Sequence, residues 1–434
     1  MTRFDDVIGK ALKELRATFE DLPETYLVRD TNGALVVILP DNVLSQEDLN
    51  SLAVRLHDEL KPYSPGQRRV LLTKTDVIEP ADIFESADKV PVPSVAGVWL
   101  IDRLVTNQDW LRPALFETPP LPTLVAFSVK GGVGRTTALG MLAWHLAREG
   151  RHVLVVDLDL EAPGIGSMLL ADLPALGLVD WLIESANAPD SSVLSDAIGY
   201  SPIADDAAGS VRVLPAYGTD TREYIAKLGR IYAPSINAAG EIVGLADRLA
   251  RLLERIASLQ DKPDVVLMDV RAGLHDIGSA AVTRLGAEAL LFARNDGQNW
   301  WAYRQLFEHL SRSISVRKGM GDDRDLRWKL KMVAAQTEPR EDSRRDWINS
   351  SYQEWNTFYD DETAKEQSGF QPVVFDRDSS EAPHYPLFVN YDQGVRSLVL
   401  NDSSAKPDWS FVFGIFGDFF RGAEERLQSV GGRN

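Results

Sequence analysis

The sequence predicts an α/β protein whose main part is a doubly wound, mostly parallel sheet, with a small α+β domain before it and an aromatic helix after it. Three observations support this fold class. From Leu124 onward, continuous apolar strands alternate with amphipathic helices, which is typical of a parallel sheet covered on both faces. The first of these strands leads into a glycine-rich loop that opens a helix. The chain's 434 residues, at about 100–200 per domain, provide for two or three domains.

Composition excludes several classes of protein. With no cysteine, the chain cannot form disulfides, thiolate zinc sites or cysteine-ligated iron–sulfur clusters. A net charge of −18 disfavours nucleic acid and anionic membranes as partners, because both repel an acidic protein. The opening residues Met1–Asp6 are acidic where a secretory signal would be basic, and no apolar run approaches the ~18 residues that cross a bilayer. We therefore expect a cytoplasmic protein.

Residues 1–118 mix helical and strand patterns and predict the small α+β domain. Apolar residues at helical spacing predict helices over Phe4–Phe19 and Gln46–Leu60. Asn32-Gly33 is typical of a tight turn between two strands. The four strands that we expect are Tyr26–Arg29, Ala34–Leu39, Val70–Thr73 and Val98–Ile101. The proline-rich segment Glu117–Thr123 predicts an extended linker.

Residues 119–400 form the predicted main domain, and residues 401–434 the aromatic tail helix. The strands expected in the main domain are Leu124–Val129, Val153–Val156, Val211–Leu214, Val265–Met268, Ala289–Ala293, Lys331–Ala334 and Pro372–Phe375. Helices are expected over Thr136–Glu149, Ile242–Leu259 and Trp300–Ser311. The tail concentrates aromatic residues between Trp409 and Phe420, and a surface that apolar has to be buried. We expect a dimer or partner interface to cover it.

The strongest functional signal is the segment Ser128–Thr137, which reads S-V-K-G-G-V-G-R-T-T. Gly131, Gly132 and Gly134 allow the backbone to curl so that its N–H groups converge on an anion at the start of a helix. Thr136 places a hydroxyl where phosphate-binding loops bind Mg²⁺. The pattern therefore predicts a site for nucleotide phosphates.

Lys130–Thr137 resembles the deviant Walker A motif, K-G-G-x-G-K-[ST], of the ParA/MinD family of P-loop ATPases, which belong to the SIMIBI class of P-loop NTPases. Three further segments resemble this family in the right order. Val153–Glu161 is similar to its second strand and switch I, and Val211–Ala216 to its Leu-Pro-Ala strand. Val265–Gly273 is similar to its Walker B strand and switch II. The resemblance spans residues 122–395 and implies ATP and Mg²⁺ as cofactors.

The resemblance also implies roles for individual residues. The nucleotide-binding positions of the loop would be Gly131, Gly132, Val133, Gly134, Arg135, Thr136 and Thr137. Thr136 would ligate Mg²⁺, Thr137 would bind an α-phosphate oxygen, and Asp269 would hold a magnesium-bound water. Lys130 would reach the nucleotide of a second subunit, where a cation joins the two subunits and offsets charge in the transition state. Otherwise Lys130 is a solvated lysine at the entrance of the loop.

Two acids near the loop are candidates for catalysis. Asp159 ends a buried strand, where a carboxylate can orient the attacking water or a metal-bound water, and Asp157 lies two residues earlier as a supporting group. Either could instead be an ordinary acid at a strand end. For base recognition the resemblance indicates Gln336 or the loop after Phe375. Arg271 in the switch II segment could contact a partner or be a plain loop residue.

Arg135 stands where the family has lysine. Arginine keeps the positive charge, but its planar guanidinium is bulkier and needs a different cradle. Nucleotide binding should survive this change, because the backbone amides and the magnesium ligands are unaffected. Two hypotheses stay open: slow ATP hydrolysis, or a scaffold that binds nucleotide without turning it over.

We expect a homodimer across ATP that acts as a switch for an unidentified protein partner. Asp157–Gly164 and Asp269–Asp276 resemble stand-alone members of the family from bacterial conflict or defence loci. A third reading is a DNA-positioning ATPase of the partition type. Its only support is a small basic cluster formed by Arg340, Arg344 and Arg345, which could equally be a solvated loop.

Overall fold

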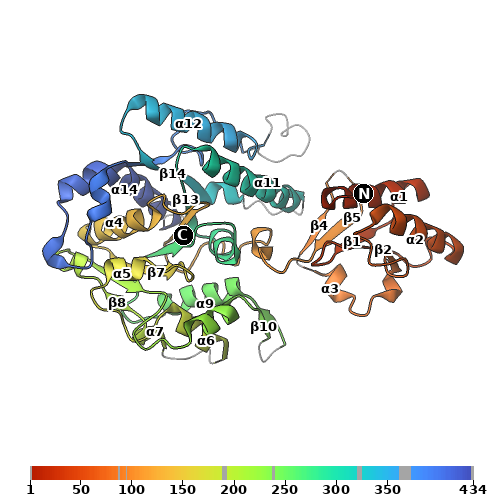
Figure 1. Ribbon diagram of the computed structural model, residues 1–434, viewed down its shortest axis with the longest axis horizontal. Coiled ribbons are helices and arrows are strands. Elements are labelled where there is room, and N and C mark those ends of the chain that lie inside the picture. The colour runs from red at the N-terminus through yellow and green to blue at the C-terminus, as the bar shows by residue number, and fades with distance from the viewer. Residues whose placement is uncertain are drawn as a thin grey trace. The chain divides into compact units, whose positions relative to one another are not determined.

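The computed structural model describes residues 2–86, 88–93, 95–187, 193–236, 240–319, 325–360 and 373–431. The chain folds as two compact units (Figure 1): residues up to Arg112 belong to the first, and residues 113–311 and 325–431 belong to the second. Each unit has its own sheet and its own hydrophobic core.

The first unit is an α+β fold around a five-stranded sheet with the order β3-β2-β1-β5-β4. Its strands are β1 (Thr25–Arg29), β2 (Leu35–Leu39), β3 (Leu71–Thr73), β4 (Lys89–Pro91) and β5 (Val98–Asp102). The helices are α1 (Val7–Thr18), α2 (Gln46–Leu60) and the short α3 (Ala81–Phe84). The apolar faces of α1 and α2 and one face of the sheet share a core that includes Leu15, Val37 and Leu56. Gly33, in the turn between β1 and β2, has a φ of +87°, which the predicted hairpin turn requires.

The second unit contains an eight-stranded sheet with the order β15-β14-β13-β6-β12-β7-β9-β8. The strands are β6 (Thr123–Ser128), β7 (His152–Leu158), β8 (Gly199–Tyr200), β9 (Ser210–Leu214), β12 (Val265–Val270), β13 (Glu288–Ala293), β14 (Leu330–Thr337) and β15 (Leu387–Asn390). All neighbouring strands are parallel except β8 and β9. From β6 the chain winds first toward β7 and β9 and later toward β13, β14 and β15. The loop after β6 therefore lies where the winding reverses, the usual ligand position in such sheets.

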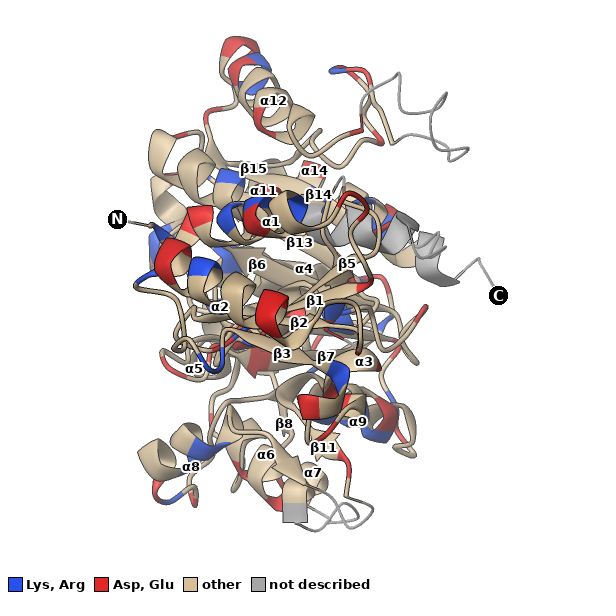
Figure 2. Ribbon diagram, turned by 90° about the vertical axis from the view of Figure 1, so that its right-hand side faces the viewer, with Lys and Arg blue, Asp and Glu red and all other residues tan. Residues whose placement is uncertain are grey.

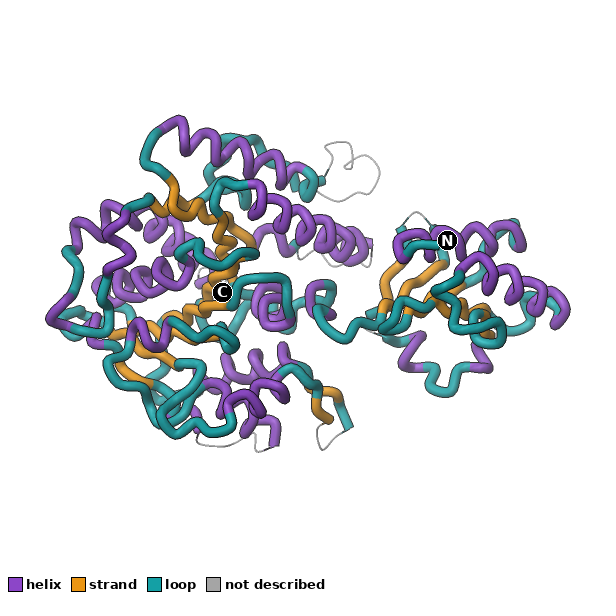
Figure 3. Tube along the Cα trace, in the orientation of Figure 1, coloured by secondary structure: helices purple, strands orange, loops and turns teal. Residues whose placement is uncertain are grey.

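Helices cover both faces of this sheet, as Figure 3 shows. On one face α4 (Arg135–Arg148), α5 (Ile165–Leu169) and α14 (Trp409–Gly431) share a core with alternate residues of the strands. The opposite face carries α9 (Leu245–Ala257), α10 (Asp276–Ser279) and α11 (Gly297–Gly319). The remaining elements are α6 (Leu178–Asn187), α7 (Val193–Asp196), α8 (Tyr224–Ile231), the ribbon β10 (Ser235–Ile236) and β11 (Ile242–Val243), and α12 (Glu341–Asn356). The predicted doubly wound α/β fold is confirmed.

Two element predictions were wrong. Residues 373–376 have no regular structure, Pro372 lies outside the described residues, and the last strand is β15. The backbone N–H of Val373 donates to the carboxylate of Asp360 at 2.9 Å. This side chain therefore accepts the hydrogen bond that a neighbouring strand would otherwise accept. The helix expected over Ile242–Leu259 begins only after Gly244, because Ile242 and Val243 pair with β10.

The sequence suggested that a dimer or partner interface would bury the aromatic tail. The structure shows that the tail is buried within its own chain instead. Helix α14 packs within its own chain, where Phe416, Phe419 and Phe420 are at most 1% exposed. The ring of Phe420 stacks on His145 of α4 with the centroids 4.5 Å apart. Phe413, by contrast, is 41% exposed and faces outward. Among the described helices, none is both long enough and apolar enough to pass through a membrane.

Replacing Phe420 with alanine should therefore destabilise the monomer. We expect Phe420→Ala to lower the free energy of unfolding by about 3–5 kcal/mol, because a fully buried ring is removed from a packed core. The matched variant Phe413→Ala should cost about 1 kcal/mol or less, since that side chain is partly exposed already. Urea unfolding followed by circular dichroism measures both. Equal costs for the two variants would contradict the packing of α14 described above.

Candidate functional site

The glycine-rich loop joins the carboxyl end of β6 to the first turn of α4. Gly132 and Gly134 have φ angles of +74° and +84°, in the left-handed region that favours glycine. A Cβ atom at Gly131 or Gly132 would meet nothing within 4 Å. The outer surface of the loop is therefore open where its N–H groups and the start of α4 favour an anion.

Gln336, at the carboxyl end of β14, lies against this loop. Its Nε2 donates a hydrogen bond of 3.0 Å to the carbonyl oxygen of Gly132. Its φ of +53° is uncommon for a residue other than glycine, and such a conformation persists where the surroundings hold it in place. The structure thus brings Gln336 to the loop backbone, while its contact with a nucleotide base stays a prediction.

Three carboxylates gather beside the loop at the ends of two neighbouring strands. Asp157 in β7 lies opposite Asp269 in β12, and Asp159 follows β7 directly. Burial, and then the charge of Asp269, raises the pKa of Asp157 to about 7. The Oδ atoms of Asp157 accept hydrogen bonds from the backbone N–H groups of Asp159, at 3.1 Å, and Gly166, at 3.4 Å. Burial also raises the pKa of Asp269, and Arg135 opposes that shift.

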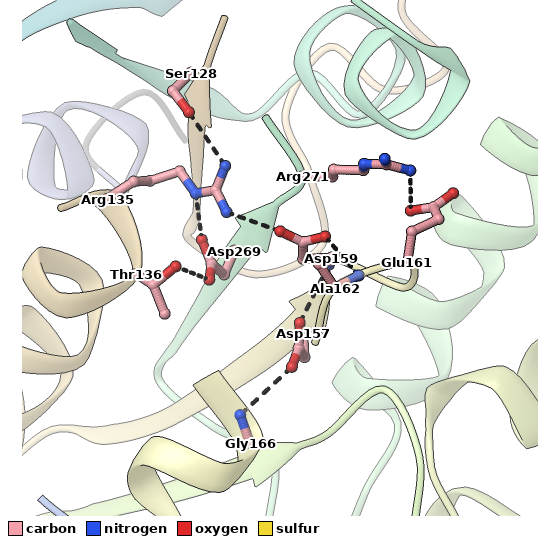
Figure 4. A network of polar contacts seen from close by, with 10 residues as sticks. All are labelled: Ser128, Arg135, Thr136, Asp157, Asp159, Glu161, Ala162, Gly166, Asp269 and Arg271. Carbon is pink, nitrogen blue, oxygen red and sulfur yellow. Dashed lines mark hydrogen bonds and ion pairs between the residues drawn. The ribbon is translucent and has the colours of Figure 1, made fainter. Parts of the chain in front are cut away.

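The side chain of Arg135 lies among these acids (Figure 4). Its Nε donates to Oδ1 of Asp269 at 2.6 Å, and its Nη2 lies 3.3 Å from Oδ2 of Asp159. Its Nη1 donates to Oγ of Ser128 at 3.2 Å. The side chain is only 7% exposed. The sequence placed Arg135 at the phosphates, and nothing in the motif spacing indicated these carboxylate contacts.

Thr136 and Asp269 are suitable ligands for Mg²⁺. The hydroxyl of Thr136 donates to Oδ2 of Asp269 at 2.7 Å, so a hydroxyl and a carboxylate oxygen lie side by side. These are the oxygen donors that a hard cation prefers. Within the described residues, no group of three or more histidine or acidic side chains could hold a metal ion alone. Phosphate oxygens and water would have to complete the coordination.

The other predicted loop residues lie around this centre. Val133 is buried and anchors the loop, while Thr137 is half-buried in the first turn of α4. Lys130 is exposed, and its ammonium has no ion-pair partner in the described part of the chain. The roles of these residues toward nucleotide remain predictions.

A second layer of polar contacts was missed by the sequence reasoning. Glu161 pairs with Arg271 at 3.1 Å and accepts a hydrogen bond from the hydroxyl of Tyr232. The hydroxyl of Tyr224 donates to the carbonyl oxygen of Leu160 at 2.5 Å. These contacts tie the switch I segment to the switch II segment and to α8. The sequence analysis had singled out Arg271, as a partner contact or a plain loop residue, and contained Glu161 only as the last residue of the switch I motif.

One family model and several solved structures are similar to this chain. A family model described as an AAA domain matches residues 123–168, which include β6, the loop, α4 and β7. No curated protein matches the chain. The similar solved structures include a ParA family ATPase from Chlorobium tepidum, with 14% identity, a TM-score of 0.38, and coverage of 70% of this chain and 98% of that chain. An ATP complex of McdA from Cyanothece has 15% identity, a TM-score of 0.41, and coverage of 71% and 97%.

A putative plasmid partition protein from Borrelia burgdorferi bound to AMPPNP has 12% identity and a TM-score of 0.34, and the match covers 74% of this chain and 98% of that one. The family-model match falls on the segment that carries the Walker A and switch I motifs. This match agrees, over residues 123–168, with the predicted resemblance to the ParA/MinD-like P-loop ATPases.

The raised pKa of Asp157 predicts a pH dependence of stability. The folded protein holds this proton up to about pH 7, whereas an unfolded aspartate releases it near pH 4. The stability that this proton contributes is complete below about pH 4 and is lost as the pH rises to about 7. Asp157→Asn cannot ionise, so its stability relative to wild type should rise over that range by up to about 4 kcal/mol.

Urea unfolding at about pH 5 and about pH 8 measures this difference. The exposed Asp205→Asn serves as the control for the substitution itself. Parallel pH profiles of wild type and Asp157→Asn would contradict the prediction.

Proposed function

We propose that the chain is an ATP- and Mg²⁺-dependent ATPase that dimerises around nucleotide and acts as a switch for a protein partner in the cytoplasm. The observation that carries this proposal is the open glycine loop with the Thr136 hydroxyl hydrogen-bonded at 2.7 Å to the buried carboxylate of Asp269. A phosphate-binding backbone and two magnesium ligands thus meet at the point where the sheet reverses its winding. The similarity to ParA/MinD-like ATPases supports the same reading.

Each group near the loop has a defined task in this proposal. The N–H groups of the loop and the first turn of α4 bind the phosphates, and Thr136 and Asp269 hold the metal, which neutralises phosphate charge. Asp159 lies at the mouth of the site, 14% exposed, where it can orient the attacking water. Asp157 is fully buried and bonded to the backbone N–H of Asp159, so it acts by positioning Asp159.

Dimerisation across ATP is supported by Lys130. Its side chain is exposed at the entrance of the loop, and no acid among the described residues neutralises it. An exposed cation beside bound triphosphates is placed to contact the nucleotide of a second copy. The proposal of a protein partner, including one from a bacterial defence locus, is supported only by the amino-acid sequences of the two switch motifs.

The alternative is a scaffold that binds ATP without hydrolysing it. It is favoured by one observation, the engagement of Arg135 by Asp269 and Asp159, which withholds a cation and the candidate catalytic acid from the phosphates. Hydrolysis requires that these contacts rearrange when nucleotide binds.

A DNA-positioning role has little support in the charges. Arg344 pairs with Asp418 at 2.8 Å, and Arg345 lies 3.5 Å from Glu341. Arg340 pairs with Glu338. Figure 2 shows acidic and basic residues interspersed along α12, so this cluster offers no uncompensated positive surface to a phosphodiester backbone.

Calorimetry tests nucleotide binding. Wild type should bind ATP in the presence of Mg²⁺, and Thr136→Val should weaken binding by about tenfold or more, because the hydroxyl ligand is lost while the shape is kept. Asp296→Asn, a conservative change in the loop between β13 and α11, should bind like wild type. No heat with either ATP or GTP would refute the proposal.

Phosphate release under saturating Mg-ATP separates the enzyme from the scaffold. We expect slow release by wild type and a loss of at least about tenfold in Asp159→Ala, because the group that orients the water is removed. Light scattering of the same samples should show a dimer with ATP, and a monomer for Thr136→Ala combined with Asp269→Ala. Tight ATP binding with no release in wild type would establish the scaffold instead.

A further inference from the structure

Each nitrogen of the Arg135 guanidinium donates a hydrogen bond to a side chain outside the glycine loop. Nε, Nη1 and Nη2 each have a partner, namely Asp269, Ser128 and Asp159. Both oxygens of Asp269 are in use as well, one by Arg135 and the other by the hydroxyl of Thr136. The motif assigns Arg135 to the phosphates and Asp269 to the metal. In the structure these two side chains are bound to each other instead.

Arginine rather than lysine makes this arrangement possible. An ammonium is a compact point charge at the end of a flexible chain, whereas the guanidinium presents donors in several fixed directions. Arg135 uses that geometry to connect residues of three segments: Ser128 at the end of β6, Asp159 after β7 and Asp269 in β12. The departure from the family's lysine thus has a structural purpose in the chain without nucleotide.

Burial makes the ionised form of Asp269 costly unless a cation lies beside it. Asp269 is 1% exposed, and Asp159 is 14% exposed by its side chain. A buried carboxylate without a compensating charge is strongly unfavourable. Whatever removes the guanidinium from Asp269 must therefore leave the carboxylate neutralised by another cation or by a proton.

We infer that Arg135 and Mg²⁺ exchange at Asp269: the guanidinium neutralises the site when no nucleotide is bound, and the metal ion that arrives with the nucleotide replaces it and frees it toward the phosphates. This inference rests on the proposed function and adds a regulatory step to the same site. Because the tethered guanidinium competes with the metal, Mg²⁺ alone binds wild type poorly. Nucleotide phosphates shift the balance by attracting both cations at once.

Thermal unfolding without any nucleotide tests the exchange. The full chain is melted in EDTA and in millimolar Mg²⁺, as wild type and as Arg135→Gln. Wild type should show the same Tm in both. Arg135→Gln should melt lower in EDTA and recover by about 2–4 °C or more in Mg²⁺, because the ion replaces the missing cation.

Three variants keep the outcome interpretable. Arg135→Gln combined with Asp269→Asn has neither charge and should not respond to Mg²⁺. Arg135→Lys, which keeps one charge, should respond less than Arg135→Gln and remains informative if the latter does not fold. Arg271→Gln removes a neighbouring arginine that pairs with Glu161 instead, and it should behave like wild type.

Equal stabilisation of wild type and Arg135→Gln by Mg²⁺, or no stabilisation of Arg135→Gln and Arg135→Lys, would overturn the exchange. These outcomes are independent of the calorimetric test with ATP. If wild type binds Mg-ATP but is also stabilised by Mg²⁺ without nucleotide, the exchange is refuted and the proposed function stands. If the melting experiment gives the expected pattern but the chain does not bind nucleotide, the role of Arg135 as the neutralising cation stands and the proposed function is refuted.

Discussion

The neutralisation of one buried carboxylate determines how the site is built. Asp269 ends a strand at the centre of the sheet, where it is 1% exposed, and its oxygens are bound by Arg135 and Thr136 from the first turn of α4. The glycine loop before these two residues can stay open because they hold its end to β12. Strand, loop and helix are thus fixed relative to one another by charge as well as by packing.

Much of the fold and the location of the site could be predicted from the sequence. Apolar runs such as Val265–Met268 form strands because a short continuous apolar run is typical of a strand buried on both faces. Gly132 and Gly134 adopt left-handed angles that other residues avoid. These are local properties, and local patterns report them reliably. The motif order then indicated which strand ends would meet, and the structure brings Thr136, Asp157, Asp159 and Asp269 together.

The predictions that failed depend on contacts between distant segments. The apolar run at Val373 resembles a strand, but its N–H is satisfied by Asp360. The aromatic tail looked like an interface because its partner, the face formed by α4 and the sheet, is assembled from segments far away in the sequence. The engagement of Arg135 by Asp159 and Asp269 has the same origin, since spacing within one motif does not show which acids lie near its cation.

The strand order also has a consequence for biosynthesis. β6 (Thr123–Ser128) pairs only with β12 (Val265–Val270) and β13 (Glu288–Ala293), which lie far downstream in the chain. A ribosome therefore finishes the glycine loop long before it makes the strands that support it, and contacts between such distant segments form slowly. During that interval the strands that pair with β6 have not yet been made, and an unpaired apolar strand is prone to aggregation.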